Sequence, residues 1–326
     1  MALAWVTAWP LRYILAVAKV LSKLPGAVLF TGNRMVVWWL VLVYAMFGAA
    51  WLISRRRKVR YWIPAACSVL ALCAVLTVNA VQLQRTSTVT ALDVSQGQSI
   101  VFSSGRACAV VDCGGRSTAE DPGDLAARKL LAQGHRSLDL LVLTHPHDDH
   151  VNGVLRLMHW LPVRTLVIPA VADTTQAPLS DILALAEANH TAVVRVDAER
   201  TVTAGGISVH LYPEPCAGQE DGSMIVLASI GDYDTLVPGD VDMTAEVKFL
   251  SSCTYPGIEL LLVGHHGSNR STSDAWLDAI APDAAIISVG YNSYGHPTSE
   301  TLERLQAHNI PIYRTDQMGD ITVHLS

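Results

Sequence analysis

The densest group of potential metal ligands is the stretch 145–150, which reads His-Pro-His-Asp-Asp-His. It directly follows an apolar run typical of a buried strand. Imidazole and carboxylate groups suit zinc or manganese, and such groups are costly to desolvate without a partner. We therefore expect His145 and His147 to turn toward one ion, and Asp149 and His150 toward a neighbouring ion. A solvated surface turn is the alternative.

Four further candidate ligands also follow apolar, strand-like runs. They are Asp240 in Pro-Gly-Asp, the pair His265 and His266 before Gly-Ser, and His296 in Tyr-Gly-His-Pro. Each signal is weak alone, because turns use Gly and Asp routinely and surface histidines are common. Their shared position is stronger, since α/β folds assemble sites at the carboxyl ends of strands. A carboxylate at Asp240 could bridge two ions.

Short strands alternating with amphipathic helices are expected to position these residues, beginning near Thr88. The expected strands are 88–93, 99–102, 107–112, 138–144, 166–169, 207–212, 223–229, 235–237, 259–263 and 284–289. The expected helices are 124–133, 150–160, 180–189, 243–250, 273–280 and 298–308. This mixture predicts an α/β fold built in layers.

Two long uncharged runs precede this region. Met35–Ile53 has 19 residues and Tyr61–Val81 has 21, close to the length that crosses a bilayer. The loop between them, Ser54–Arg60, carries five positive charges, which predicts that this loop is cytoplasmic and that the rest of the chain after the second run is extracytoplasmic. A pair of buried core helices is the alternative.

The first 34 residues mix tryptophan and aliphatic residues with scattered cations such as Arg12 and Lys19. This pattern predicts an amphipathic helix on the membrane surface, with a signal peptide as the competing interpretation. We thus divide the chain into a surface segment (1–34), two spans (35–53 and 61–81) around a basic loop (54–60), and a domain from 82 to 326.

Charge and cysteine content limit the function. The first acidic residue is Asp93, and the segment from Gln82 onward carries 14 Lys/Arg against all 29 Asp/Glu, a formal charge of −15. Such a domain repels a polyanion, and no basic stripe with interleaved aromatic residues is visible. Cysteines after position 82 show no zinc pattern; disulfides among Cys108, Cys113, Cys216 and Cys253 remain open.

Six motifs together resemble the C-terminal part of the ComEC DNA-uptake competence proteins. They are Leu92–Ser99 (Leu-Asp-Val-Ser-Gln-Gly-Gln-Ser), Val111–Gly115, Thr144–His150, Pro238–Asp240, Gly264–Ser268 and Tyr294–Pro297. The resemblance covers about three quarters of the chain, from Gln82 to the end. It implies a metallo-β-lactamase fold, a four-layer αββα sandwich with two metal ions at one edge of the paired sheets.

The resemblance also implies a ligand set. His145 and His147 would bind the first zinc or manganese ion, Asp149, His150 and His296 the second, and Asp240 would bridge them. The superfamily often supplies another first-site histidine from the interval before Asp240, where this chain has no convincing candidate.

Further roles follow from the same resemblance. One of His265 and His266 is expected to fill the vacant ligand position and the other to donate a proton or contact phosphate. We expect Asp149 to take part in catalysis beside these two histidines. Asp112 would anchor a ligand from behind, and the candidates for substrate contact are Ser268 and Arg270.

The function implied is hydrolysis of DNA phosphodiesters outside the membrane, degrading the strand that is not taken up. The expected partners are DNA, the membrane, and other uptake proteins or the family's large N-terminal competence region. That region is missing, so we expect a fragment or one piece of a split gene. Relatives usually have aspartate where this chain has Gln98. The alternatives are a surface phosphodiesterase or esterase acting on a small or cell-wall substrate, and a non-catalytic docking component of the uptake channel.

Overall fold

Two seven-stranded sheets form the centre of the molecule. The computed structural model describes residues 2–21, 34–116, 120–213 and 223–325. The first sheet has the order β14-β1-β2-β3-β4-β5-β6 and the second β13-β12-β11-β10-β9-β8-β7. Strands of the first sheet are β1 Ser87–Ala91, β2 Ile100–Ser104, β3 Ala107–Val111, β4 Leu138–Val142, β5 Val163–Pro169, β6 Ala192–Val196 and β14 Ile321–Leu325. Those of the second are β7 Arg200–Ala204, β8 Ile207–Tyr212, β9 Ile225–Ile230, β10 Tyr233–Val237, β11 Leu260–Leu262, β12 Ala284–Ile287 and β13 Ile312–Arg314.

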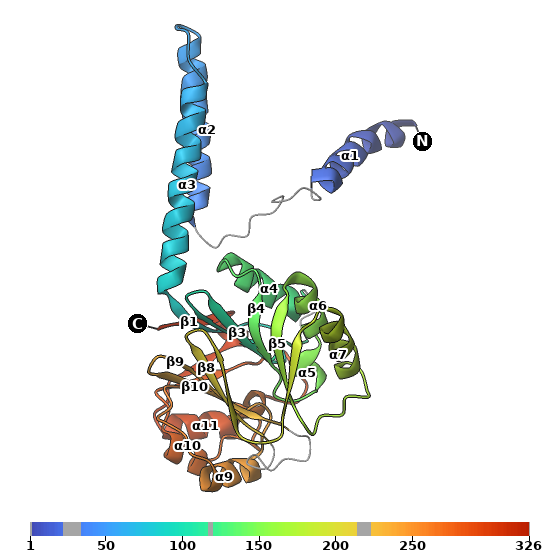
Figure 1. Ribbon diagram of the computed structural model, residues 1–326, viewed down its shortest axis with the longest axis vertical. Helices are drawn as coiled ribbons and strands as arrows, with labels where there is room; N and C mark the ends of the chain where they lie inside the picture. The colour runs from blue at the N-terminus through green and yellow to red at the C-terminus, as the bar shows by residue number, and fades with distance from the viewer. Residues whose placement is uncertain (1, 22–33, 117–119, 214–222, 326) are drawn as a thin grey trace.

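Helices cover the outer face of each sheet (Figure 1). On the first sheet lie α4 Pro122–Ala132, α5 Asp148–Val151, α6 Val154–Trp160 and α7 Leu179–Ala188; on the second lie α9 Met243–Ser252, α10 Asp274–Ile280 and α11 Ser299–Ala307, with the short α12 Thr315–Met318 following β13. One apolar cluster fills the space between the sheets, and one lies under each helical layer. Burial of these three clusters stabilises the four layers, which confirms the predicted αββα sandwich.

The strand directions bring the candidate ligands to one edge. Strands β3 to β6 run parallel to one another, as do β10 to β13. Because parallel strands end at the same edge of a sheet, the segments after β3, β4, β10, β11 and β12 gather there. These segments carry Asp112, 145–150, Asp240, the His265–His266 pair and His296.

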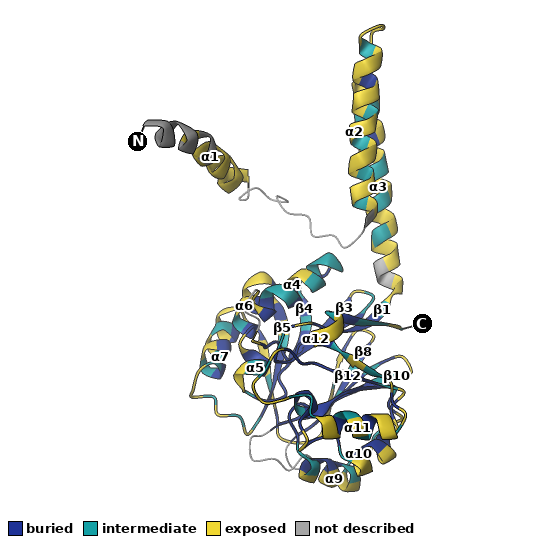
Figure 2. Cartoon of the chain, turned by 180° about the vertical axis from the view of Figure 1, so that it is seen from behind, coloured by how far each residue is buried: buried dark blue, intermediate teal, exposed yellow. Residues whose placement is uncertain are grey.

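Helices α2 (Arg34–Ser54) and α3 (Trp62–Arg85) form a long antiparallel hairpin (Figure 1). Most of their residues are exposed (Figure 2), and only 6% of the most apolar stretch of each helix is buried. The Trp39 indole donates a hydrogen bond to the Ser68 carbonyl at 2.9 Å. Both helices are long and apolar enough to cross a membrane, whereas core helices of a soluble domain would be buried.

Helix α1 (Ala2–Leu21) carries exposed apolar side chains, including Tyr13 and Ile14. Its predicted place on a membrane surface stays a prediction. Residues 22–33, which complete that predicted segment, lie outside the described residues. Cys67, Cys73, Cys108 and Cys113 are free thiols, and Cys216 lies outside the described residues.

Three local predictions need correction. The helix expected over 150–160 is two helices, α5 and α6, separated by Asn152 and Gly153. The break lies where the chain packs closely against the first turn of α4. A Cβ on Gly153 would lie 2.5 Å from the Gly123 nitrogen, so this contact requires glycine. The strand expected over 138–144 ends at Val142, since the Thr144 amide turns to the Asp112 carboxylate instead. Strands β6, β7, β13 and β14 were not predicted.

Candidate metal centre

The ligand-rich loop after β4 is held by backbone contacts with the segments just before β2 and just after β3. The Gln98 amide donates to the Asp149 carbonyl at 3.0 Å, and the Cys113 amide donates to the His150 carbonyl at 2.8 Å. The segment after β3 lies so close to this loop that position 114 requires glycine, because a Cβ on Gly114 would lie 2.5 Å from the His150 nitrogen. The loop's position is therefore set by main-chain hydrogen bonds and by the absence of a side chain at position 114.

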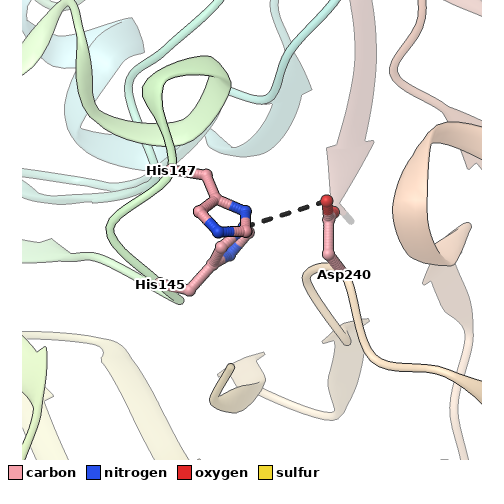
Figure 3. Close-up of side chains that lie close together, drawn as sticks. All are labelled: His145, His147 and Asp240. Carbon is pink, nitrogen blue, oxygen red and sulfur yellow. Dashed lines mark ion pairs between the residues drawn. The ribbon is translucent and has the colours of Figure 1, made fainter. Parts of the chain in front are cut away.

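Two clusters of three residues each could hold a metal ion. The first comprises His145, His147 and Asp240, and the second comprises Asp149, His150 and His266. Within each cluster the potential ligand atoms all lie within 4.8 Å of one another. Figure 3 shows the first cluster, in which the two histidines of one loop face an aspartate from the opposite sheet. These donor sets match the nitrogen and oxygen ligands of zinc or manganese.

Asp240 lies between the two clusters. Its Oδ2 is 3.8 Å from His145 Nε2 and 3.5 Å from His265 Nε2. Its Oδ1 faces the other cluster, at 3.2 Å from His150 Nε2 and 3.9 Å from His266 Nε2. One carboxylate oxygen thus faces each cluster, which is the arrangement that a bridging ligand requires.

Asp112 fixes the orientation of His150 from behind. Its Oδ2 accepts hydrogen bonds from His150 Nδ1 at 2.7 Å, Thr144 Oγ1 at 2.7 Å and Gln98 Nε2 at 2.8 Å. With its proton on Nδ1, His150 presents the Nε2 lone pair to the cluster. Gln98 donates to Asp112 and so adds no second carboxylate beside it.

The two consecutive histidines after β11 point in different directions. His265 and His266 both have positive φ, at 50° and 54°, a strained conformation for residues other than glycine that is concentrated at functional sites. His266 Nδ1 donates to the Ser288 carbonyl at 2.9 Å, which leaves its buried Nε2 directed at Asp149 Oδ2, 3.6 Å away. His265 keeps 39% of its side chain exposed beside Asp240.

The electrostatics of the clusters call for added positive charge. Burial opposes ionisation of Asp240, but His150 and His266 hold the pKa of its carboxyl well below the usual value. Burial also disfavours a charged His150, yet the carboxylates of Asp240 and Asp112 raise its pKa well above normal. A proton on the histidine between the two carboxylates would balance part of their negative charge, and a divalent cation would do the same.

Histidine ring nitrogens without a hydrogen-bond partner also indicate that the clusters suit metal ions. The Nε2 atoms of His145, His150 and His266 are buried and make no hydrogen bond to the described residues. Burying such an acceptor without a partner costs free energy, and all three lie around Asp240. Metal coordination would satisfy each of them, so the residues present fit a pair of divalent ions.

His296 lies beside the clusters, although the resemblance implied that it belongs to the second. Its ring centroid is 5.6 Å from that of His265, and its backbone is held by Asn292. Burial, followed by the neighbouring His265, lowers the pKa of His296, so its ring is neutral near pH 7. The described three-residue cluster beside Asp149 and His150 is completed by His266, and a ligand role for His296 stays a prediction.

The clusters open into a cleft of about 460 Å³. It is lined by Gln96, Arg116, Pro146, His147, Asp148, Asp149, Ala177, Pro178, Asp240, His265, His266, Tyr294 and His296. Arg116 Nη1 donates to the Tyr294 hydroxyl at 3.2 Å, so a cation and an aromatic ring stand together at the cleft. Sequence reasoning missed Arg116, although it directly follows the Val111–Gly115 motif.

The two residues predicted to contact substrate lie elsewhere. Ser268 is buried, and its hydroxyl accepts from the Arg270 amide at 3.3 Å, which closes a turn. Arg270 is exposed, and its carbonyl accepts from the Met243 amide at 2.8 Å. Neither is among the described residues that line the cleft, so their contact with substrate stays a prediction.

The family model of the metallo-beta-lactamase superfamily matches residues 92–291, well over half of the chain. The chain belongs to the metallo-beta-lactamase superfamily. Members of this superfamily are generally metal-dependent hydrolases, and the fold implies divalent metal ions. The match spans β2 through β12 and includes both clusters. A solved structure of similar fold is the metallo-beta-lactamase fold protein YhfI from Bacillus subtilis, with a TM-score of 0.51 and 12% identity over 74% of this chain and 100% of that one.

Two curated relatives confirm the resemblance to ComEC-type competence proteins. ComE operon protein 3 of Bacillus subtilis (strain 168) is 29% identical over 71% of this chain and 32% of its own length. Competence protein ComA of Neisseria gonorrhoeae is 31% identical over 71% of this chain and 31% of its own length. The chain thus spans about a third of the length of these relatives.

Proposed function

We propose that this chain is a membrane-anchored di-metal phosphodiesterase that cleaves DNA on the outer side of the membrane. The observation that carries the proposal is the placement of Asp240, with one carboxylate oxygen toward each three-residue cluster. Paired sites of this kind suit in-line displacement at phosphorus. In ComEC-type relatives the domain belongs to competence proteins, which supports DNA as the substrate.

We assign the metal-holding role to His145, His147 and Asp240 on one side and to Asp149, His150 and His266 on the other. Bound there, two divalent ions would supply Lewis-acid stabilisation of phosphoryl charge and a water activated at neutral pH. Asp112 keeps the Nε2 lone pair of His150 available throughout, because it accepts the Nδ1 proton.

The remaining cleft residues would bind and orient the substrate. His265 is half-buried beside Asp240 and reaches the cleft, so it can donate a proton to the departing sugar oxygen. The Arg116 guanidinium can pair with a phosphate outside the clusters, and the exposed Tyr294 ring offers a surface on which a base can stack. This assigns phosphate contact to Arg116 in addition to the predicted Ser268 and Arg270.

We place α2 and α3 across the membrane with the loop 54–60 in the cytoplasm. The support is the length and apolar exposure of both helices and the cationic loop between them. The hydrolase domain, which follows α3, then lies outside. A protease added to spheroplasts should cut the domain; protection there, with cleavage only from the cytoplasmic side, contradicts this orientation.

A smaller phosphodiester is the second candidate substrate. It is favoured by the formal charge of −15 from Gln82 onward, which weakens the binding of a polyanion, and by a cleft of about 460 Å³. A single phosphodiester carries little charge and needs only Arg116 and the clusters for recognition.

The deciding experiment offers the full chain three substrates in the presence of manganese or zinc. These are labelled single-stranded DNA, labelled double-stranded DNA and bis(p-nitrophenyl) phosphate, with Asp240→Ala as the matched inactive control. Hydrolysis of DNA by the wild type alone supports the proposal. Hydrolysis of the small diester without cleavage of DNA favours the second candidate, and no hydrolysis of any substrate favours a docking component.

A further inference from the structure

Three arginines lie at the amino ends of three neighbouring strands, opposite the metal clusters. Arg106 immediately precedes β3, Arg136 lies two residues before β4, and Arg164 is the second residue of β5. These strands are adjacent and parallel, so their amino ends share one edge. Neighbouring strands are about 4.8 Å apart, which brings the three guanidinium groups within reach of one ligand.

The arginines surround a hollow of about 430 Å³. It is lined by Ala80, Gly105, Arg106, Gln133, Gly134, His135, Arg136, Ser137 and Arg164. Ala80 belongs to α3, so the hollow is closed on one side by the last turns of the apolar helix. The Gly105 amide also donates to the Thr86 carbonyl just beyond that helix, at 3.3 Å, which ties the arginine-bearing turn to its end.

The charge of this hollow is opposite to that of its domain. One carboxylate, Asp139, pairs with Arg164 at 3.1 Å and also accepts from the Cys108 amide. Burial lowers the pKa of His135, so it adds no charge near pH 7. The described lining of the hollow contains three arginines and no acidic residue, so it is a cationic site within a segment of formal charge −15.

We propose that this hollow binds the phosphate headgroup of an anionic phospholipid. The proposal rests on the membrane-spanning placement of α3 made above. With α3 in the bilayer, the hollow beside Ala80 lies at the level where lipid headgroups begin, and arginine pairs well with phosphate. DNA held at the metal clusters would lie at the other ends of β3, β4 and β5, so the lipid is the ligand that the position favours.

The test titrates the full chain, purified in a neutral detergent, with phosphatidylglycerol in mixed micelles. The test variant is Arg106→Gln/Arg136→Gln, which leaves the Arg164–Asp139 pair intact. The matched control is Arg195→Gln/Arg200→Gln, which removes the same charge from exposed positions on β6 and β7. Removing two interfacial arginines should weaken phosphatidylglycerol binding roughly thirtyfold. The control variant should bind like the wild type.

Parallel titrations separate the possible ligands. Phosphatidylcholine and inorganic phosphate are expected to bind weakly and equally to all three proteins. Equal loss of phosphatidylglycerol binding in both variants, or no loss in either, overturns the proposal. Tight binding of a short oligonucleotide that the Arg106→Gln/Arg136→Gln change abolishes, without an effect on the lipid, also overturns it and assigns the hollow to nucleic acid.

Failure of this proposal can be told apart from failure of the proposed function. Hydrolysis of bis(p-nitrophenyl) phosphate is measured on the same samples, and it should be unchanged in the Arg106→Gln/Arg136→Gln variant. Loss of lipid binding with intact hydrolysis supports the hollow as a separate site. The micelle titration needs no oriented membrane. It therefore measures lipid binding at the hollow even if the protease test contradicts the proposed orientation.

Discussion

The two ends of β3, β4 and β5 carry opposite chemistry. The carboxyl ends lead to buried imidazoles and carboxylates, with Asp112 and His150 both fully buried and hydrogen-bonded to each other. The amino ends carry arginines whose side chains reach solvent. A buried, interlocked group of polar residues is sensitive to every substitution, whereas exposed cations contribute singly and modestly. The same strands thus carry one site that is sensitive to substitution, at their carboxyl ends, and one that is less sensitive, at their amino ends.

The largest effect is expected from the residue shared by both clusters. Asp240→Ala removes the carboxylate that faces both, so phosphodiester hydrolysis should fall at least about a thousandfold. Initial rates with manganese measure the effect, and circular dichroism checks that the sheets remain folded. His147→Ala should behave similarly. Turnover within a few fold of wild type in either variant contradicts the two-cluster account.

Substitution of Asp112, which lies behind the candidate ligand His150, should have a smaller effect than substitution of Asp240. Asp112→Asn replaces the acceptor of the His150 Nδ1 proton with a group that is uncharged and also a donor. Metal affinity should fall by about ten- to a hundredfold, measured by competition with a chromophoric chelator. Unchanged affinity would show that the ring of His150 needs no anchor and that the buried network is structural only.

Local patterns predicted the alternating strands and helices and the strand ends that carry the clustered side chains, because both signals lie within short stretches of sequence, whereas the αββα arrangement was implied by the resemblance. The four unpredicted strands, β6, β7, β13 and β14, are the outer strands of the two sheets. Edge strands bury fewer side chains, so their apolar alternation is weak; β6, for example, buries only its last residue. Strand β14 also pairs with β1 across nearly the whole domain, a contact that no local pattern encodes.

The division of roles between His265 and His266 could not be predicted for a related reason. Both belong to one motif, and their rings diverge because each residue adopts a positive φ between β11 and the following loop. That geometry is set by tertiary packing, including the Ser288 carbonyl from the next strand end. Arg116 was missed because its partner, Tyr294, is distant in sequence.

Substrate contact at the cleft should show as weaker binding with little change in turnover. Arg116→Ala is expected to raise KM for a DNA substrate about tenfold, because one charge-assisted hydrogen bond is lost. Steady-state kinetics give KM and kcat separately. Arg195→Ala removes an equal charge from an exposed position on β6, outside the described lining of the cleft, and serves as the control. An equal rise in KM for both variants would mean that general charge, and not the cleft, governs binding.

The smallest effect is expected when arginines at the amino ends of the strands are substituted and the activity at the carboxyl ends is measured. Arg106→Gln/Arg136→Gln should leave metal content and hydrolysis within about twofold of wild type, because distant sites act independently. Metal analysis and initial rates of the same preparation provide the measurement. A large loss of either quantity would couple the two ends and remove the contrast between them.

Metal content of the purified full chain tests the central claim most directly. After incubation with zinc or manganese and removal of free ions, elemental analysis should find about two ions per chain, one for each cluster. His266→Ala should lower that content toward one, because it takes one ligand from the second cluster only. One ion or none on the wild-type chain contradicts the paired metal centre.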